Sequence, residues 1–158
     1  MTDRELSIAL REMARVQKKP LCDKWYGQWD DDTDVDGLLD MYVRGFDFVQ
    51  ENDYPPLDFI RRNFKKEDLH RHNIYVDESV VIDDAQNGYY VFLGDTKATV
   101  VADGFKAVTV YCRHDSEVNV RAMNGARVFV TFYEQSSGVC KSDEMSKIKK
   151  YIYHKSKK

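Results

Sequence analysis

Three aspartates at alternate positions form the part of the chain whose spacing best suits a metal ion. Asp32, Asp34 and Asp36 precede Gly37, which is the opening D-x-D-x-D-G of an EF-hand calcium loop. Alternate carboxylates and a glycine turn can wrap a hard cation, but loop position twelve, where a bidentate carboxylate is required, is Val43. Acids are also favoured in the first turn of a helix. We therefore expect no metal and no cofactor, with these aspartates as the one calcium candidate.

Two histidines suggest a second kind of metal chemistry. His70 and His72 flank Arg71. On a strand the two imidazoles would share one face, as a metal site requires, whereas residues two apart on a helix do not face each other. A third ligand is not evident nearby. The sequence therefore predicts a surface or helix-end role for this pair.

Nucleophilic and phosphate-binding motifs do not stand out. Ser136-Ser137-Gly138 lacks the G-x-S-x-G elbow, and Cys140 has no basic neighbour beyond Lys141 to lower its pKa. Neither glycine-rich phosphate loop pattern occurs. These observations favour a protein that binds over one that catalyses.

Lysines and tyrosines alternate near the end of the chain. Residues 141–158 carry 7 lysines against 2 acids, whereas residues 1–73 carry 12 basic residues against 16 acids. Cations interleaved with aromatic rings can bind single-stranded nucleic acid. The simpler interpretation is a terminal strand whose charged edge discourages edge-to-edge pairing. The lysines concerned are Lys147, Lys149, Lys150 and Lys155, with Tyr151 and Tyr153 between them.

Aromatic side chains are the residues on which we would place a contact surface. The chain contains ten Tyr and eight Phe, which require a core or an interface. The candidates for binding are Trp25, Trp29, Tyr54, Tyr111 and Phe129. The same residues are equally suited to a core, and the sequence leaves that choice open.

Helical periodicity in the first half of the chain supplies the elements that would position these groups. Thr2 can cap a helix beginning at Asp3, with Glu5 completing a capping box, and residues 18–20 end the apolar pattern.

A second helix is predicted from about Asp34 to Glu51, capped by Thr33 or Asp32. Shorter helical segments follow over residues 56–64 and 68–73, before a strand at residues 74–76.

A repeat of ten residues dominates the second half. Val100, Val110, Val120 and Val130 occupy equivalent positions in four alternating segments, with turn residues such as Asn124-Gly125 between segments. We call these equivalent positions a column. Earlier in the chain the column continues at Tyr90/Phe92 and Val80/Ile82, and later at Cys140.

The unbroken spacing predicts an α+β fold, in which an N-terminal helical segment precedes a short β-solenoid of ten-residue units. Two units would make one coil with two sides. An antiparallel β-meander or sandwich remains the alternative, because Asn-Gly and Asp-Gly corners are also hairpin signals. We expect a helical head over residues 1–73 and a repetitive β region with a basic tail over residues 74–158, in one folding unit.

Alternation within the two-sided coil also assigns the outward faces. One face would carry Tyr89, Val91, Tyr111, Phe129 and Thr131, which is too apolar to remain in water. We therefore predict that this face is covered, by the helices or by a second subunit.

Composition predicts a soluble protein of the reducing cytoplasm. The formal net charge is −3, and the three cysteines are scattered without a CxxC pair. No apolar stretch approaches the roughly 18 residues of a membrane span, and the first residues lack the apolar core of a signal peptide. Cys112, in the inward column, is expected to be buried.

The helical half resembles small uncharacterised proteins carried by phages and other mobile elements of gut bacteria, which pair a short helical head with a repetitive β tail. The residues that carry the resemblance are 45–49, 52–55, 59–64, 69–72 and, in the β region, 107–111. It implies an accessory protein in a bacterial cell that binds something, and it implies no activity or catalytic residues.

We therefore favour a non-enzymatic binding or structural protein: a host-protein inhibitor, a nucleotide-signal sponge or a virion component. A protein partner or a homo-oligomer is expected, a small-molecule ligand is possible, and nucleic acid and membranes are not expected. The alternatives are an enzyme acting on carbohydrate or a nucleotide through acids such as Asp84 and Asp103, and a nucleic-acid-associated protein that uses the lysine-rich tail.

Overall fold

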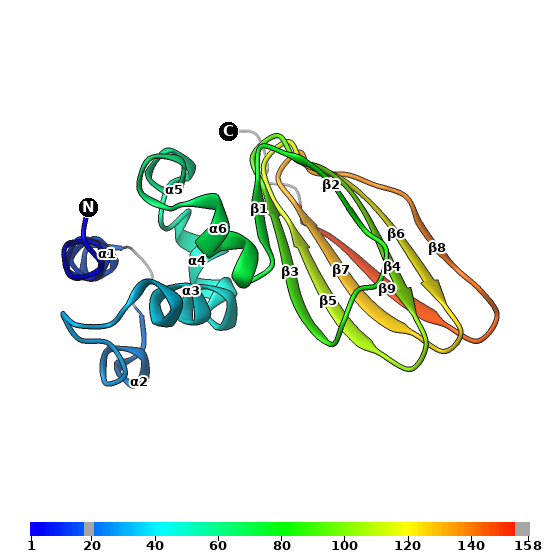
Figure 1. The fold of residues 1–158 in the computed structure, drawn as a ribbon, viewed down its shortest axis with the longest axis horizontal. Helices are drawn as coiled ribbons and strands as arrows, with labels where there is room; N and C mark the ends of the chain where they lie inside the picture. The colour runs from blue at the N-terminus through cyan, green and yellow to red at the C-terminus, as the bar shows by residue number, and fades with distance from the viewer. Residues whose placement is uncertain (18–20, 154–158) are drawn as a thin grey trace. The chain divides into compact units, whose positions relative to one another are not determined.

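Two units make up the chain in the computed structural model, which describes residues 1–17 and 21–153. The chain divides into Met1–His72, which is helical, and Asn73–Lys158, which contains the strands. Each unit is described by itself (Figure 1).

The helical unit contains six helices in its described residues. They are α1 (Asp3–Arg15), α2 (Asp23–Tyr26), α3 (Val35–Arg44), α4 (Phe46–Asn52), α5 (Leu57–Asn63) and α6 (Lys66–Arg71). The predicted capping box is confirmed at the start of α1, where the Thr2 hydroxyl accepts from the Glu5 N–H and the Glu5 carboxylate accepts from the Thr2 N–H. The same helix ends at Arg15, and the predicted stop at residues 18–20 lies outside the described residues.

The prediction of one continuous helix from Asp34 to Glu51 is wrong. The segment is divided at Gly45 into α3 and α4, because the backbone of Gly45 has φ −98° and ψ 31° and so leaves the helical region. The cap is neither Thr33 nor Asp32. The Asp34 carboxylate accepts from the Gly37 N–H at 2.8 Å and so satisfies a helix-start donor.

The second unit is a two-sided parallel β-solenoid, as predicted, and the antiparallel alternative is wrong. Its five-stranded sheet has the order β1-β3-β5-β7-β9 and its four-stranded sheet the order β2-β4-β6-β8 (Figure 1). The strands are β1 (Ile74–Val76), β2 (Ser79–Ile82), β3 (Gly88–Leu93), β4 (Lys97–Asp103), β5 (Ala107–Cys112), β6 (Glu117–Met123), β7 (Arg127–Tyr133), β8 (Cys140–Ser142) and β9 (Lys147–Tyr153). Each coil contributes one strand to each sheet.

Register between coils follows a twenty-residue interval from β3 onward. Val100 lies opposite Val120 in one sheet, and Val110 opposite Val130 in the other. The backward extension to Val80 is wrong, because Val80 lies opposite Ala98 and it is Ile82 that aligns with Val100. The first coil is therefore shorter than the coils that follow.

The solenoid core is the inward column. Val100, Val110, Cys112 and Ala122 are fully buried, and Phe132 is nearly so. This arrangement confirms the expectation that Cys112 is a buried residue, and burial raises its pKa well above the usual thiol value.

One corner of each coil is held by a hydroxyl that the ten-residue pattern did not predict. Thr96, Ser116 and Ser136 are spaced by twenty residues and are buried. Each hydroxyl lies 2.6–2.8 Å from the carbonyl oxygen three residues earlier, and each also approaches a carbonyl of the preceding coil. These bonds satisfy backbone oxygens where the chain leaves the strand.

Candidate binding surface

Two of the aromatic candidates belong to the helical core. Trp29 is buried, and its indole Nε1–H donates to Ser7 Oγ at 2.8 Å. Tyr54 is buried, its hydroxyl donates to the Leu10 carbonyl at 2.7 Å, and burial raises its pKa. For Trp29 and Tyr54 the core alternative therefore holds.

Trp25 is half-buried and lies beside a cation. The guanidinium carbon of Arg44 is 5.2 Å from the centroid of the Trp25 ring. A cation over an indole face is a stabilising contact. Trp25 is thus the one sequence-predicted binding residue of the helical unit that retains an accessible ring.

The three aspartates of the calcium candidate are directed to separate partners. Asp32 pairs with Arg4 at 2.5 Å, and Asp34 caps α3. Asp36 accepts from His72 Nε2 at 2.8 Å and from Arg71. Because α3 begins at Val35, the turn that would gather the carboxylates does not form. Within the described ranges, no three His, Cys, Asp or Glu side chains are grouped to hold a metal ion.

Asp36 is instead the centre of a charge cluster on the helical unit. Hydrogen bonds from His72 and then Arg71 hold the pKa of Asp36 below its usual value. Arg71 also donates to Asp68 at 2.6 Å within α6, and the bonds of Arg71 and His72 to Asp36 link the end of α6 to the start of α3. His72 therefore has the helix-end role that the sequence predicted, as an inter-helix partner and not as a metal ligand. His70 is on α6, exposed, and has a partner of its own.

Aromatic and cationic side chains share the outward face of the five-stranded sheet. Strand alternation places them on one side. We call this set the aromatic face. Its members are Tyr89 on β3, Tyr111 on β5, Phe129 on β7, and Lys147, Lys149, Tyr151 and Tyr153 on β9.

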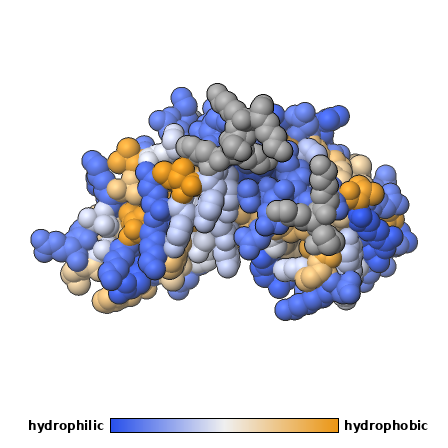
Figure 2. Space-filling view, turned by 180° about the vertical axis from the view of Figure 1, so that it is seen from behind, coloured by the Kyte–Doolittle hydropathy of each residue, from blue (hydrophilic) through white to orange (hydrophobic). Residues whose placement is uncertain are grey.

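Exposure on the aromatic face is uneven. Tyr89 is 41% exposed and Phe129 42%, whereas Val91 is fully buried and Thr131 is 8% exposed. Tyr89 and Phe129 are therefore exposed in the isolated chain, and cover of this face by the helices or by a second subunit stays a prediction. Figure 2, which shows the side opposite to Figure 1, displays hydrophobic residues as separate patches among hydrophilic ones.

Rings on the aromatic face stack along the solenoid axis. Tyr89 and Tyr111 lie 6.0 Å apart with an interplanar angle of 16°, and Tyr133 stacks on Tyr153 at 5.8 Å. The Lys149 ammonium lies 5.8 Å from the centroid of the Phe129 ring. In each of these contacts, one face of a ring is thus covered by a side chain of a neighbouring coil.

The terminal lysines do not form one cluster. Lys147 and Lys149 are on the aromatic face, whereas Lys150 lies on the opposite side of β9. There its ammonium donates to the Gly138 carbonyl at 3.2 Å and lies over the Phe132 ring. Lys155 is outside the described residues.

A buried ion pair at the corner after β5 was not found by sequence reasoning. Arg113 is 1% exposed and donates through Nε and Nη2 to Glu134 Oε1, each at 2.8 Å. His114 Nδ1 accepts from the Gly94 N–H, and its Nε2 is 3.9 Å from Glu134. A buried charge requires a paired partner, and this pair joins consecutive coils. The twenty-residue interval between coils could have indicated this pair, because it places residue 113 next to residue 133 and therefore near Glu134.

Acids at the solenoid corners serve the turns. Lys106 pairs with Asp84 and lowers its pKa. Asp103 accepts from the Asn124 side chain at 2.6 Å. Asp143 accepts from the Asn124 N–H, and this bond lowers the pKa of Asp143. Asp84 and Asp143 are thus stabilised in their charged form by neighbours on adjacent coils.

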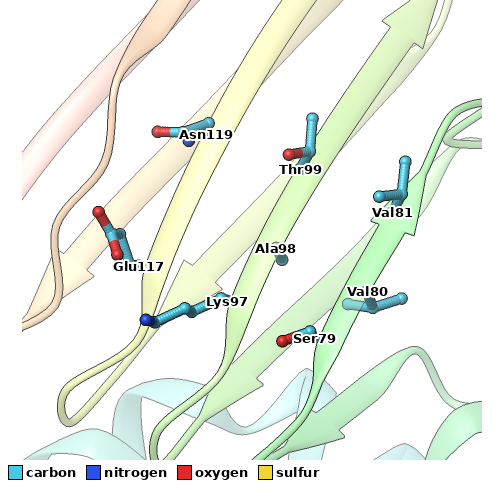
Figure 3. A pocket seen from close by; sticks show the side chains of 8 residues that line it. All are labelled: Ser79, Val80, Val81, Lys97, Ala98, Thr99, Glu117 and Asn119. Carbon is cyan, nitrogen blue, oxygen red and sulfur yellow. The ribbon is translucent and has the colours of Figure 1, made fainter.

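A shallow pocket of about 360 Å³ lies on the outward face of the four-stranded sheet (Figure 3). Val81, Thr99 and Asn119 project from adjacent strands in one column, and Lys97 lies opposite Glu117 in another. Opposite charges directly across a strand pair stabilise the sheet. The pocket lacks the enclosed apolar walls that small-molecule sites have.

Comparison with known proteins adds no relative. No family model, curated protein or solved structure matches the chain. Among the described helices, none has the length and apolar composition needed to cross a bilayer.

Proposed function

We propose that the chain is a non-enzymatic binding protein in which the β-solenoid is a rigid support and the aromatic face contacts a protein partner. In the setting that the resemblance implies, it is an accessory protein of a phage or mobile element that acts on a host or virion protein inside a bacterial cell.

The observation that carries the proposal is the collection of exposed rings and cations on one sheet. Tyr89, Phe129, Tyr151 and Tyr153 are each at least 41% exposed. Tyrosine and phenylalanine are enriched at protein interfaces, where a ring provides contact area at low entropic cost. Lys147 and Lys149 at the edge of this face favour an acidic partner surface.

The carboxylates with shifted pKa values all accept hydrogen bonds from neighbouring residues, which favours a binding protein over an enzyme. Asp36, Asp84 and Asp143 hold depressed pKa values because each accepts bonds from a neighbouring residue. A general acid at neutral pH needs the opposite shift. These three carboxylates are therefore suited to structure.

Site-specific photo-crosslinking tests the proposal. A benzophenone amino acid replaces Phe129 in one sample and, as a matched control, Thr99 on the outward face of the other sheet. We expect a crosslinked protein of discrete mass from position 129 only, suppressed by excess unlabelled protein. Equal products from both positions, or no product from position 129, would contradict it.

Single-stranded nucleic acid is a second candidate, because Lys147 and Lys149 share a face with Tyr151 and Tyr153. The stacking of Tyr153 on Tyr133 and of Lys149 over Phe129 occupies ring faces that bases would need, so we rank this candidate lower. It predicts that an oligonucleotide binds with steep salt dependence and that Lys149→Glu weakens binding more than Lys97→Glu does. Salt-independent binding, or equal effects of the two variants, would exclude it.

A further inference from the structure

The last strand of the five-stranded sheet has an open edge. β9 pairs with β7 on one side, and in the described residues no strand pairs with its other side. In the part of the chain that the structure describes, the four-stranded sheet ends with β8, so β9 has no strand opposite it. The side chains here are unusually exposed for their type: Tyr151 is 42% exposed, Ile152 56% and Tyr153 57%. An exposed edge strand with apolar side chains is a template for pairing with another chain.

The backbone of β9 determines which residues would form the new bonds. Lys147 donates its N–H to the Ala126 carbonyl, and the Tyr153 carbonyl accepts from the Glu134 N–H, both at 3.0 Å. The odd-numbered residues therefore direct their polar groups towards β7. Because these directions alternate along a strand, the N–H and C=O groups of Ile148, Lys150 and Ile152 point to the open edge.

The sequence of β9 is complementary to itself in the antiparallel direction. It reads Lys-Ile-Lys-Lys-Tyr-Ile-Tyr over Lys147–Tyr153. With two copies related by a twofold axis at Lys150, Ile148 meets Ile152, Lys149 meets Tyr151, and Lys147 meets Tyr153. In this register every lysine except Lys150 faces a ring, and the two isoleucines face each other.

We propose that two copies of this chain associate by antiparallel pairing of their β9 strands, centred on Lys150. The interface is isologous, as a twofold dimer requires. The residues whose polar groups point to the open edge become the hydrogen-bonded pairs. The Lys–Tyr pairs then occupy the closer, non-hydrogen-bonded positions, where a cation can lie on a ring.

The central lysine does not oppose this register. The Lys150 ammonium bonds the Gly138 carbonyl of its own chain at 3.2 Å and lies 5.4 Å from the centroid of the Phe132 ring. Its charge is thus drawn towards its own coil and away from the twofold axis. The hydrogen bonds of the dimer form along the β9 edge and need no other partner, but the Lys–Tyr pairs use the part of the aromatic face that lies on β9, over Lys147–Tyr153.

Light scattering coupled to size exclusion tests the association on the full chain. We expect the wild-type protein, at about 0.1 mM, to have twice the monomer mass of 18.5 kDa. Ile152→Lys should give a monomer, because it adds a charge opposite Ile148 of the second copy and beside its Lys150. Val81→Lys, at an exposed apolar residue of β2, should remain dimeric. A monomeric wild type, or equal effects of both substitutions, overturns the proposal.

A charge-swap series tests the register. Tyr151→Lys sets two lysines opposite each other and should weaken the dimer by about tenfold. Adding Lys149→Tyr to the same chain recreates a Lys–Tyr pair at that position and should restore most of the affinity. Failure of the double variant to recover, with circular dichroism unchanged, overturns the register centred on Lys150. A wild-type dimer that resists Ile152→Lys shows that the copies meet elsewhere and also overturns the proposal.

Discussion

At the residue scale, one buried hydroxyl joins two segments of the helical unit. Ser7 is fully buried, donates to the Asp30 carbonyl at 2.6 Å and accepts from the indole of Trp29 at 2.8 Å. Ser7→Ala leaves the indole N–H without its acceptor, and we expect a loss of about 1–3 kcal/mol in the free energy of unfolding.

Urea unfolding followed by tryptophan fluorescence measures this loss, because both tryptophans belong to the helical unit. Glu12→Ala, at an exposed position of the same helix, is the control and should change stability by less than about 0.5 kcal/mol. Equal effects of the two substitutions would show that the Ser7 bonds contribute nothing.

The charge cluster around Asp36 predicts a pH dependence. The pKa of this carboxyl is lowered in the folded state, first by its bond from His72 and then by Arg71. Its stabilising contribution is therefore complete above the ordinary carboxyl pKa and is lost as the pH falls through the lower folded value. Asp36→Asn should be less stable than wild type near neutral pH, and the difference should diminish in acid.

Fluorescence-detected unfolding of both proteins between pH 7 and about pH 3 provides the measurement. Asp47→Asn, on an exposed carboxylate of α4, is the control. A difference between Asp36→Asn and wild type that stays constant through acid would contradict the assigned cause.

At the element scale, the corner hydroxyls connect one coil to the next. Ser116 Oγ lies 2.8 Å from the Arg113 carbonyl oxygen and 3.4 Å from that of Phe92 in the preceding coil. Ser116→Ala removes the donor from buried oxygens and should cost about 1–3 kcal/mol. Thermal unfolding monitored by circular dichroism in the strand region tests it. Ser142→Ala, at an exposed position, is the control and should have little effect on thermal stability. A comparable loss of stability in this control would contradict the proposed role of the corner hydroxyls.

The strands were predictable because a coil tolerates few insertions. The valines at positions 100, 110, 120 and 130 define the core, and their spacing fixes two opposite sides of one coil. The first coil was misaligned because Val80 pairs with a residue 18 positions later and not 20, and no deviation shows there in the hydrophobic pattern. The corner hydroxyls were missed because Thr96 and Ser116 recur every twenty residues, once per coil, whereas the sequence was searched for a repeat of ten residues, once per strand.

The helices were predictable in existence but not in their boundaries. Apolar residues continue past Gly45 with helical spacing, and only the backbone angles of Gly45 reveal the break. Aromatic residues posed a different difficulty, since a ring with a polar atom suits both a core and a surface. The hydrogen bonds of Trp29 and Tyr54 decide for the core, and those partners are more than 20 residues away in the sequence.

At the scale of the whole molecule, the two units have different kinds of contacts. Helices in residues 1–72 pack through side chains such as Leu39, whereas coils in residues 73–158 repeat one ladder in which Val110 is central. Repeat arrays derive their stability from neighbouring coils. The sequence suggested one folding unit, but because the contacts divide into two units we now expect each unit to have its own unfolding transition.

A crossed pair of core substitutions tests this independence. Leu39→Ala creates a cavity in the helical unit, and Val110→Ala creates one in the solenoid; each should cost about 2–4 kcal/mol, because both side chains are buried. Tryptophan fluorescence reports on the helical unit, and strand-region circular dichroism reports mainly on the solenoid. Leu39→Ala should lower the fluorescence midpoint in urea and leave the strand midpoint unchanged, and Val110→Ala should do the reverse. If either substitution moved both midpoints together, the chain would unfold as one cooperative unit, because the free energy lost in one set of contacts would then be shared by the other.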